Sequence, residues 1–410
     1  MPSFLSRKID VETYLISSTI ISVFLLIRVA RIGVDIFAGY PVIILNTLLM
    51  LALGRLIIHR NHAIIISTIA LVSLLASRFS PTPVTAVIAQ ILGISLMSIY
   101  YFSALVTSGP TVPRWLELYA RAAFYIAVYG IFDYILRHTM LYDRTAEQRL
   151  RSVFAEPSLF IYTTLPAIGF YINTWHSERR YGWEALIFLM AYILADSALG
   201  FLGLLLIAIF TYTRRFTVWH VLGAGAAALM LVTALYFVSQ NFRLRISDTA
   251  IAVSSQSLKN SNASTFAFLS NAYVATSAMI DHPILGVGIG GFGNIYDTYI
   301  SELGKEELRD ANVGLNKEDA NSLFMRVAAE LGPAGLIALV GFLAICARVE
   351  GQPHRGIRNS LLPYMVVRMS RFGAYFSMEL YFFVGLYLLN YLDYRRKFIF
   401  SLLENAEKHP

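Results

Sequence analysis

Residues 84–107 read VTAVIAQILGISLMSIYYFSALVT, an apolar run without a single Asp, Glu, Lys or Arg. A helix that crosses a lipid bilayer needs roughly 20 such residues. Similar runs recur along the chain, at 13–30, 38–58, 63–77, 84–107, 115–136, 158–174, 182–196, 198–213, 218–238 and 322–347. The seventh and eighth almost touch at Asp196–Ser197, which predicts a tight hairpin. The pattern predicts an all-α, polytopic integral membrane protein.

The composition supports this prediction and excludes a soluble globular enzyme. The chain has 410 residues, of which 57% are hydrophobic and 14% are charged. Soluble domains are roughly 45–50% apolar and about 25% charged. We therefore expect residues 1–410 to form a single transmembrane domain.

The net charge of +7, with 33 Lys and Arg residues, would suggest nucleic acid as the partner of a soluble protein. In a membrane protein the positive-inside bias and anionic lipid explain the same excess. We therefore expect membrane lipid as a partner and no nucleic acid. Cys346 is the single cysteine, so a disulfide framework and a thiolate metal cluster are both excluded. No metal-ligand pattern and no cofactor motif is evident.

The basic residues predict the orientation. With the N-terminus in the cytoplasm, the inner loops carry the basic residues Arg55, Arg60, Arg114, Arg179, Arg180, Arg214, Arg215, Arg348, Arg355 and Arg358. Three stretches then lie outside: a short one near Arg28–Arg31, a loop at 137–157, and a large loop at 239–321 between the ninth and tenth spans.

The apolar stretch 361–393 precedes the basic triplet Arg395–Lys397. Two short crossings, or a re-entrant hairpin with its tip near Arg368–Arg371, would return this triplet to the cytoplasm. We favour the hairpin, which gives about 11–12 transmembrane helices. A single tilted, kinked helix is the alternative.

Several arginines break the charge bias on the outer side. Within the outer stretches and the nearby helices these are Arg137, Arg144, Arg149, Arg151, Arg243, Arg245, Arg326, Arg368 and Arg371. An arginine inside a membrane is unfavourable by roughly 2.5–3.5 kcal/mol on insertion scales, so a carboxylate or a bound anion should compensate it. Snorkelling to headgroups explains any single one. For the group, a shared anion site is the sharper hypothesis, and a phosphate-bearing lipid is its natural ligand.

The large loop contains the stretch DHPILGVGIGGFGN, in which Gly288, Gly290 and Gly293 match the spacing GxGxxG. A dinucleotide site also needs a βαβ context, and this stretch is predicted to lie outside the membrane, where NAD is not expected, so we reject such a site. Glycines allow a tight turn that approaches a ligand closely. With Gly286, these residues form either a turn that lines a ligand cavity or a simple flexible loop.

Three titratable side chains are candidates for a general base. Glu156 precedes Pro157 at the start of the sixth span, and Asp319 lies at the membrane end of the large loop. His282 follows residues 264–281, which have roughly helical apolar spacing and predict an external helix. Each has a structural alternative: Glu156 could form an ion pair, Asp319 could cap a helix, and His282 could flank a helix with its hydrogen bonds satisfied.

Four segments resemble Wzy-type bacterial polysaccharide polymerases, within the superfamily of O-antigen polymerases and ligases. They are RLRSVFAEPSLF from Arg149, DSALGFLGLLL from Asp196, HPILGVGIGGFGN from His282 and ANSLFMRVAAELGPAGLI from Ala320. The resemblance covers residues from about 140 to 345. In the ligases a histidine precedes the Asn-Ser-Leu segment, and here that position is Ala320, which favours the polymerase.

The resemblance implies a multi-span glycosyltransferase fold of the GT-C type in the bacterial inner membrane, with the active site facing the periplasm. It implies transfer of a glycan from undecaprenyl pyrophosphate to the sugar end of another lipid-linked repeat unit. This metal-independent reaction would serve lipopolysaccharide synthesis, with a chain-length regulator protein as a further partner. The pyrophosphate contacts would be Arg151, Arg243, Arg245 and Arg326, with Arg149 and Arg371 next. Glu156 would be the first candidate for the base, followed by His282 and Asp319. An O-antigen ligase is one alternative, and a flippase or other transporter is another.

Overall fold

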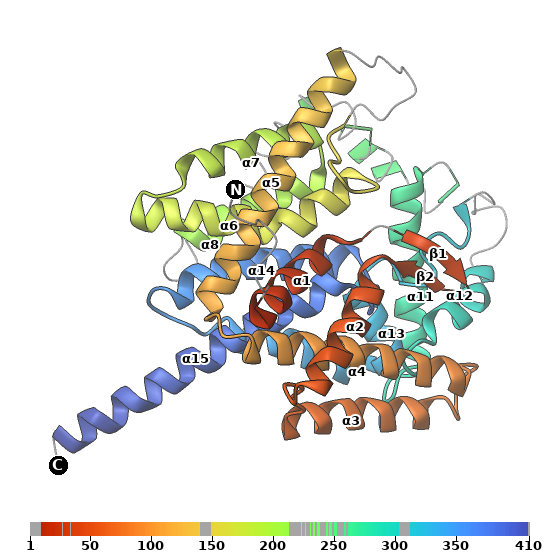
Figure 1. Ribbon diagram of the computed structural model, residues 1–410. Helices are drawn as coiled ribbons and strands as arrows, with labels where there is room; N and C mark the ends of the chain where they lie inside the picture. The colour runs from red at the N-terminus through yellow and green to blue at the C-terminus, as the bar shows by residue number, and fades with distance from the viewer. Residues whose placement is uncertain are drawn as a thin grey trace, which may run out of the picture.

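The computed structural model describes residues 10–26, 28–32, 34–139, 149–212, 258–259, 261–302 and 312–408, together with isolated positions between 223 and 251. Helices dominate these residues, which confirms the all-α prediction (Figure 1). The one β element among them is an antiparallel hairpin of β1 (Arg28–Ile32) and β2 (Val34–Phe37). The ninth predicted run, 218–238, lies largely outside the described residues, and its described positions are helical.

The N-terminal part contains four helices. They are α1 (Val11–Phe24), α2 (Gly39–Ala52), α3 (Arg60–Ala76) and α4 (Val84–Thr107). Helix α1 ends six residues before the predicted end of the first run, because the sequence changes there to β-branched residues that alternate with polar ones. The predicted outer stretch near Arg28–Arg31 is therefore part of the hairpin.

A second group of helices packs around a buried helix from the far end of the chain. It comprises α5 (Val112–Thr139), α6 (Pro157–Glu178), α7 (Gly182–Ala195) and α8 (Ala198–Tyr212), with α14 (His354–Arg371) in contact with α6 and α8 (Figure 1). Helices α6 and α14 approach closely at Gly169, where a Cβ atom would lie 2.9 Å from Cα of Ser360. The predicted tight turn at Asp196–Ser197 is confirmed, and Asp196 adopts a left-handed conformation.

Helices α11 (Ala263–Asp281), α12 (Phe292–Ser301) and α13 (Leu323–Cys346) form a third group with its own small core. The predicted helix 264–281 is confirmed as α11. Its buried face is lined by small side chains such as Ala267, Ser270 and Ala278, whereas Ile280 is exposed. Small residues let α11 pack closely on α13, so packing between helices decides which face is buried.

The apolar stretch 361–393 divides into two helices that pack against each other. Helix α14 ends at Arg371 and α15 (Met378–Lys408) begins after a non-helical segment, residues 372–377. This is the hairpin that the charge pattern favours, with its tip next to Arg371. The C-terminal part of α15 projects away from the rest of the molecule (Figure 1).

Among the described residues, α4 and α13 are long and apolar enough to cross a membrane. Five further apolar helices are shorter, namely α1, α2, α3, α7 and α8. Only 22% of the most apolar 18-residue stretch of α4 is buried within the protein, and the corresponding share for α13 is 28%. Both helices therefore leave most of their apolar surface uncovered.

Candidate functional site

A polar pocket of about 320 Å³ lies where the ends of several helices meet. Its walls come from five parts of the chain: the segment before α6, the α7–α8 turn, the start of α11, the segment before α13 and the end of α14. The lining residues are Arg149, Glu156, Pro157, Ser158, Ser197, Leu199, Ala263, Ser264, Ala267, Leu315, Asn316, Asp319, Asn321, Arg371 and Phe372. Four of the predicted site residues therefore share one pocket, namely Arg149, Glu156, Asp319 and Arg371.

Hydrogen bonds to backbone carbonyls hold the segment before α6, which forms the first wall of the pocket. The N–H of Leu150 donates to the carbonyl of Leu194 near the end of α7, at 3.0 Å, and the hydroxyl of Ser152 donates to the carbonyl of Ile126 on α5, at 2.8 Å. Pro157 then occupies the first turn of α6, where a missing N–H is harmless. Glu156 precedes it in an extended conformation, and its exposed side chain is free to face the pocket.

The opposite wall is a strained segment before α13. Asn316, Ala320 and Asn321 all have positive φ, between 56° and 58°. The Asp319 carboxylate accepts the N–H of Asn321 at 3.0 Å, and the side-chain amide of Asn316 donates to that of Asn321 at 2.8 Å. Such strain persists only where the surroundings over-determine it, and it is common at functional sites.

Gly373 joins this wall to the tip of the α14–α15 hairpin. A Cβ atom on Gly373 would overlap the carbonyl oxygen of Asp319. Only glycine permits this approach, which brings Asp319 and Arg371 to the same pocket.

Arg326 is buried and does not line the pocket. Its guanidinium pairs with Glu330 at 3.1 Å, donates to the carbonyl of Gly373 at 3.1 Å and lies over the ring of Tyr375. Arg368 is placed in the same way, paired with Glu379 at 3.0 Å and bonded to the carbonyls of Phe372 and Ala374. Both arginines hold the segment 372–377, so the compensating group for each is a carboxylate of this chain.

Of the remaining arginines predicted to contact the pyrophosphate, the two that the structure describes do not line the polar pocket. Arg151 lines a neighbouring hollow together with Arg137 and Glu156, so Glu156 stands between the two cavities. Arg243 is an exposed helical position that does not line the pocket. Arg245 lies outside the described residues.

His282 is far from the other two candidate bases. It caps the C-terminal end of α11, whereas Ala263 at the other end of this helix lines the pocket. A helix of this length separates its ends by roughly 27 Å. Nearby, Tyr299 donates to the Asp281 carboxylate at 2.9 Å, and burial together with this bond raises the pKa of Tyr299 to about 12. His282 itself ends α11, and its carbonyl accepts the N–H of Gly286 at 3.0 Å, so it lies at the start of the glycine loop and not at the polar pocket.

The glycine loop completes α13 and does not line the polar pocket. Helix α13 breaks at Gly332–Pro333, where proline cannot donate to the carbonyl of Ala329. The N–H groups of Val287 and Gly288 donate instead to the carbonyls of Ala329 and Glu330, at 3.0 and 2.9 Å. Positive φ at Gly286, Gly288 and Gly290 makes this turn possible, whereas Gly293 lies in the first turn of α12. The turn packs against α13, which differs from a simple flexible loop, and the cavity-lining interpretation stays a prediction.

Several pocket residues were not predicted from the sequence: Ser158, Ser197, Asn316, Asn321 and Phe372. Three of them, Ser158, Ser197 and Asn321, lie inside the quoted segments of the resemblance, which was the available signal. No cluster of His, Cys, Asp and Glu that could hold a metal occurs among the described residues.

The pocket therefore combines two guanidinium groups with two carboxylates. The guanidinium groups can bind a phosphate or diphosphate through paired hydrogen bonds. A carboxylate next to them can take a proton from a hydroxyl group. No protein-family model matches this chain, and no curated protein matches it in sequence.

Proposed function

We propose that the protein is a polytopic membrane glycosyltransferase that polymerises lipid-linked repeat units of a bacterial polysaccharide. The observation that carries the proposal is the polar pocket, which gathers Arg149, Arg371, Glu156 and Asp319 from distant segments. A donor with a diphosphate leaving group and an acceptor hydroxyl needs this combination of cations and a base.

Uncovered apolar surface supports the membrane assignment. Beyond α4 and α13, large side chains stand exposed on the shorter helices, among them Ile65 on α3, Trp183 on α7 and Ile193 on α7. A soluble monomer rarely exposes continuous apolar patches of this kind. A bilayer would cover them, and the short apolar helices would then serve as tilted or partial crossings.

The charge pattern supports a common face for the pocket. Under the orientation predicted from the basic residues, the segments that line the pocket all lie on the outer side. These are the ends of the outer loops, the α7–α8 turn and the α14–α15 tip. A donor lipid in the outer leaflet would reach the pocket with its headgroup.

The proposed reaction is displacement at the anomeric carbon of the donor sugar. The acceptor hydroxyl oxygen forms a bond to this carbon, and the bond to the diphosphate oxygen breaks with its electron pair. The hydroxyl proton passes to Glu156 or Asp319. Arg149 and Arg371 stabilise the charge that grows on the diphosphate. A charge pair at about 4 Å is worth about 4 kcal/mol at an effective dielectric near 20, and only the part gained in the transition state speeds the reaction.

The test is incubation of the purified protein with a defined undecaprenyl-pyrophosphate-linked repeat unit. We expect a ladder of longer products, also in excess chelator. Arg149→Ala and Arg371→Ala should each lower the rate on the order of a hundred- to a thousandfold. Arg355→Ala, at the other end of α14, is the matched control and should retain activity.

Glu156→Gln and Asp319→Asn would identify the base. Asparagine can still accept the N–H of Asn321, so Asp319→Asn preserves the wall while removing the base. Transfer of the glycan to a lipid A core without a ladder would indicate a ligase. Movement of intact lipid-linked units without any new glycosidic bond would indicate a transporter, and both results would refute the polymerase.

A further inference from the structure

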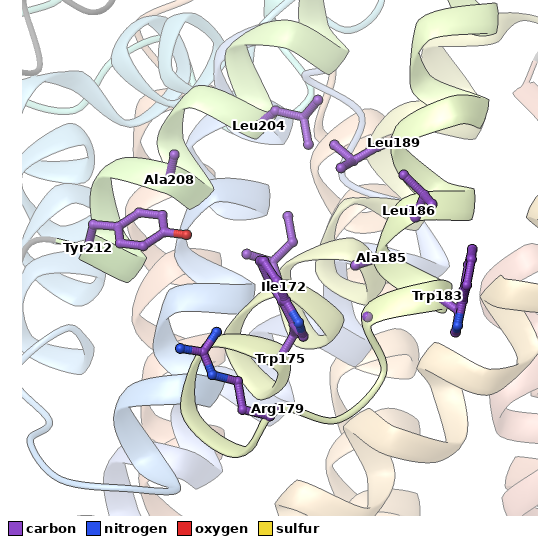
Figure 2. Close-up of a pocket in the computed structure, with 11 residues that line it drawn as sticks. Ile172, Trp175, Arg179, Trp183, Ala185, Leu186, Leu189, Leu204, Ala208 and Tyr212 are labelled. Atoms are coloured by element: carbon purple, nitrogen blue, oxygen red, sulfur yellow. The ribbon is translucent and has the colours of Figure 1, made fainter.

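An apolar groove of about 700 Å³ lies at the opposite end of the helices that form the polar pocket. It lies between α7 and α8 over the last turns of α6. Figure 2 shows Leu189 and Leu204 facing each other at one end, with Trp183 and Tyr212 on opposite sides at the other. Trp175 and Arg179 lie between them at the mouth.

The groove is lined by aliphatic and aromatic side chains with a single charged group. The lining residues are Ile172, Trp175, Arg179, Gly182, Trp183, Ala185, Leu186, Leu189, Leu204, Ala208 and Tyr212. Arg179 is the one cation among them, and no lining residue is acidic. An amphiphile with a long apolar part and an anionic end matches this distribution.

The mouth is a built structure. Arg179 caps α6 in a left-handed conformation, with φ of 58°, which an ordinary residue adopts at a cost of roughly 1–2 kcal/mol. Glycine is the usual residue at such a position. The Arg179 guanidinium lies 5.9 Å from the centre of the Trp175 ring, and this ring packs on Gly182. Tyr212 is held by an edge contact with His176.

We propose that this groove binds an acyl chain of an anionic phospholipid, with the headgroup at Arg179. The proposal rests on the membrane assignment made under the proposed function, and it is independent of glycan transfer. The volume fits a single flexible chain and lies within the range of small-ligand cavities, about 300–1,000 Å³. A partner helix would need small residues for close approach, whereas eight of the eleven lining residues are larger than alanine.

The charge also favours a phospholipid over the tail of the proposed donor. A polyprenyl tail whose diphosphate lies in the polar pocket would bring an uncharged end to the opposite side of α6–α8. The uncharged end of the tail would form no ion pair with Arg179. Under the predicted orientation Arg179 belongs to the cytoplasmic side, where anionic headgroups concentrate.

The test uses the full chain in phosphatidylcholine vesicles that contain a small fraction of dibrominated lipid. Bromine on an acyl chain quenches a tryptophan that it contacts, and Trp175 and Trp183 lie at the groove. We expect dibrominated phosphatidylglycerol to bind about fivefold better than dibrominated phosphatidylcholine, the effect of one cation near a membrane surface. Equal quenching by the two lipids would overturn the proposal.

Two pairs of variants test separately the positive charge of Arg179 and the open space of the groove. Arg179→Gly removes the cation and relieves the left-handed strain, so it should fold normally and lose the preference for phosphatidylglycerol. Arg180→Gln is its control, because Arg180 pairs with Glu178 at 3.7 Å and does not line the groove. Ala208→Phe should fill the groove and abolish the excess quenching, whereas Leu202→Phe on the same helix should not.

Two further outcomes would also overturn the proposal. An unchanged preference in Arg179→Gly would show that the cation does not select the lipid. Relief of quenching by a polyprenyl phosphate, and not by unlabelled phosphatidylglycerol, would assign the groove to the donor tail. Release of the protein from the vesicles by alkaline carbonate would refute the membrane assignment itself, so the two failures are distinguishable.

Discussion

Arg326 and Arg368 each carry a full charge in a buried place, and each is neutralised by a carboxylate of the same chain. Glu330 lies one helical turn after Arg326, and Glu379 faces Arg368 from the start of α15. Both arginines also donate to carbonyls in the segment 372–377, which has no helical partners of its own. Their placement explains why arginines in an apolar sequence need not bind a ligand.

We predict that Arg326→Met destabilises the protein by roughly 3–5 kcal/mol, because Glu330 is then a buried charge without its partner. The double variant Arg326→Met, Glu330→Met should be clearly less destabilised than the single one. Denaturation in detergent measures both. The double variant should also keep measurable activity. Complete loss of activity in a well-folded double variant would restore Arg326 as a contact of the bound anion.

At the scale of elements, neighbouring segments supply the hydrogen bonds that a broken helix cannot make within itself. The α13 break at Gly332–Pro333 is closed by the glycine turn, and the turn is anchored by hydroxyl groups of Ser80 and Thr82 that donate to the carbonyl of Val287. The turn thus connects the α3–α4 loop to α13. The α14–α15 tip, in turn, is held by Arg326 on α13.

We predict that Gly286→Ala is more harmful than its backbone conformation alone would make it. A Cβ atom there would lie 2.5–2.7 Å from the backbone of Glu330 and Ala329. Gly54 has nearly the same φ, +64° against +63°, and nothing within 4 Å. Gly54→Ala should therefore show only the strain of roughly 1–2 kcal/mol, and thermal melts of the two variants give the difference. Equal melting temperatures would mean that the turn is not packed against α13.

At the scale of the whole molecule, the two kinds of cavity lie at opposite ends of the α6–α8 layer. The start of α6 and the α7–α8 turn line the polar pocket, whereas the end of α6 and the start of α7 line the apolar groove. If α6–α8 cross the bilayer, these two sites face opposite sides.

We predict that single cysteines at the two ends react from opposite sides of the membrane. Cys346 is buried and is the single native cysteine, so a Cys346→Ser background is simple to make. An impermeant maleimide should label Ser264→Cys from the outer side and Ser177→Cys from the cytoplasmic side of sealed vesicles. Labelling of both from the same side would contradict the proposed orientation and the outer location of the pocket.

The amino-acid sequence by itself determined the helical class, the α7–α8 turn, the helix at 264–281 and the division of the stretch 361–393. These features follow from local composition, because apolar runs, prolines and charges act over a few residues of the chain. Charges in an apolar setting also pointed to Glu156, Asp319, Arg149 and Arg371, but four other arginines ranked ahead of these two, namely Arg151, Arg243, Arg245 and Arg326.

Only the tertiary structure decided which of these residues lie together. The absence of a side chain at Gly373 brings Asp319 next to the α14–α15 tip, and the length of α11 keeps His282 away. Carboxylates on α13 and α15 occupy Arg326 and Arg368, which in the sequence look no different from Arg149 or Arg371. Contacts between segments distant in the chain leave no local pattern, so packing alone distinguishes an arginine that lines a pocket from one that supports it.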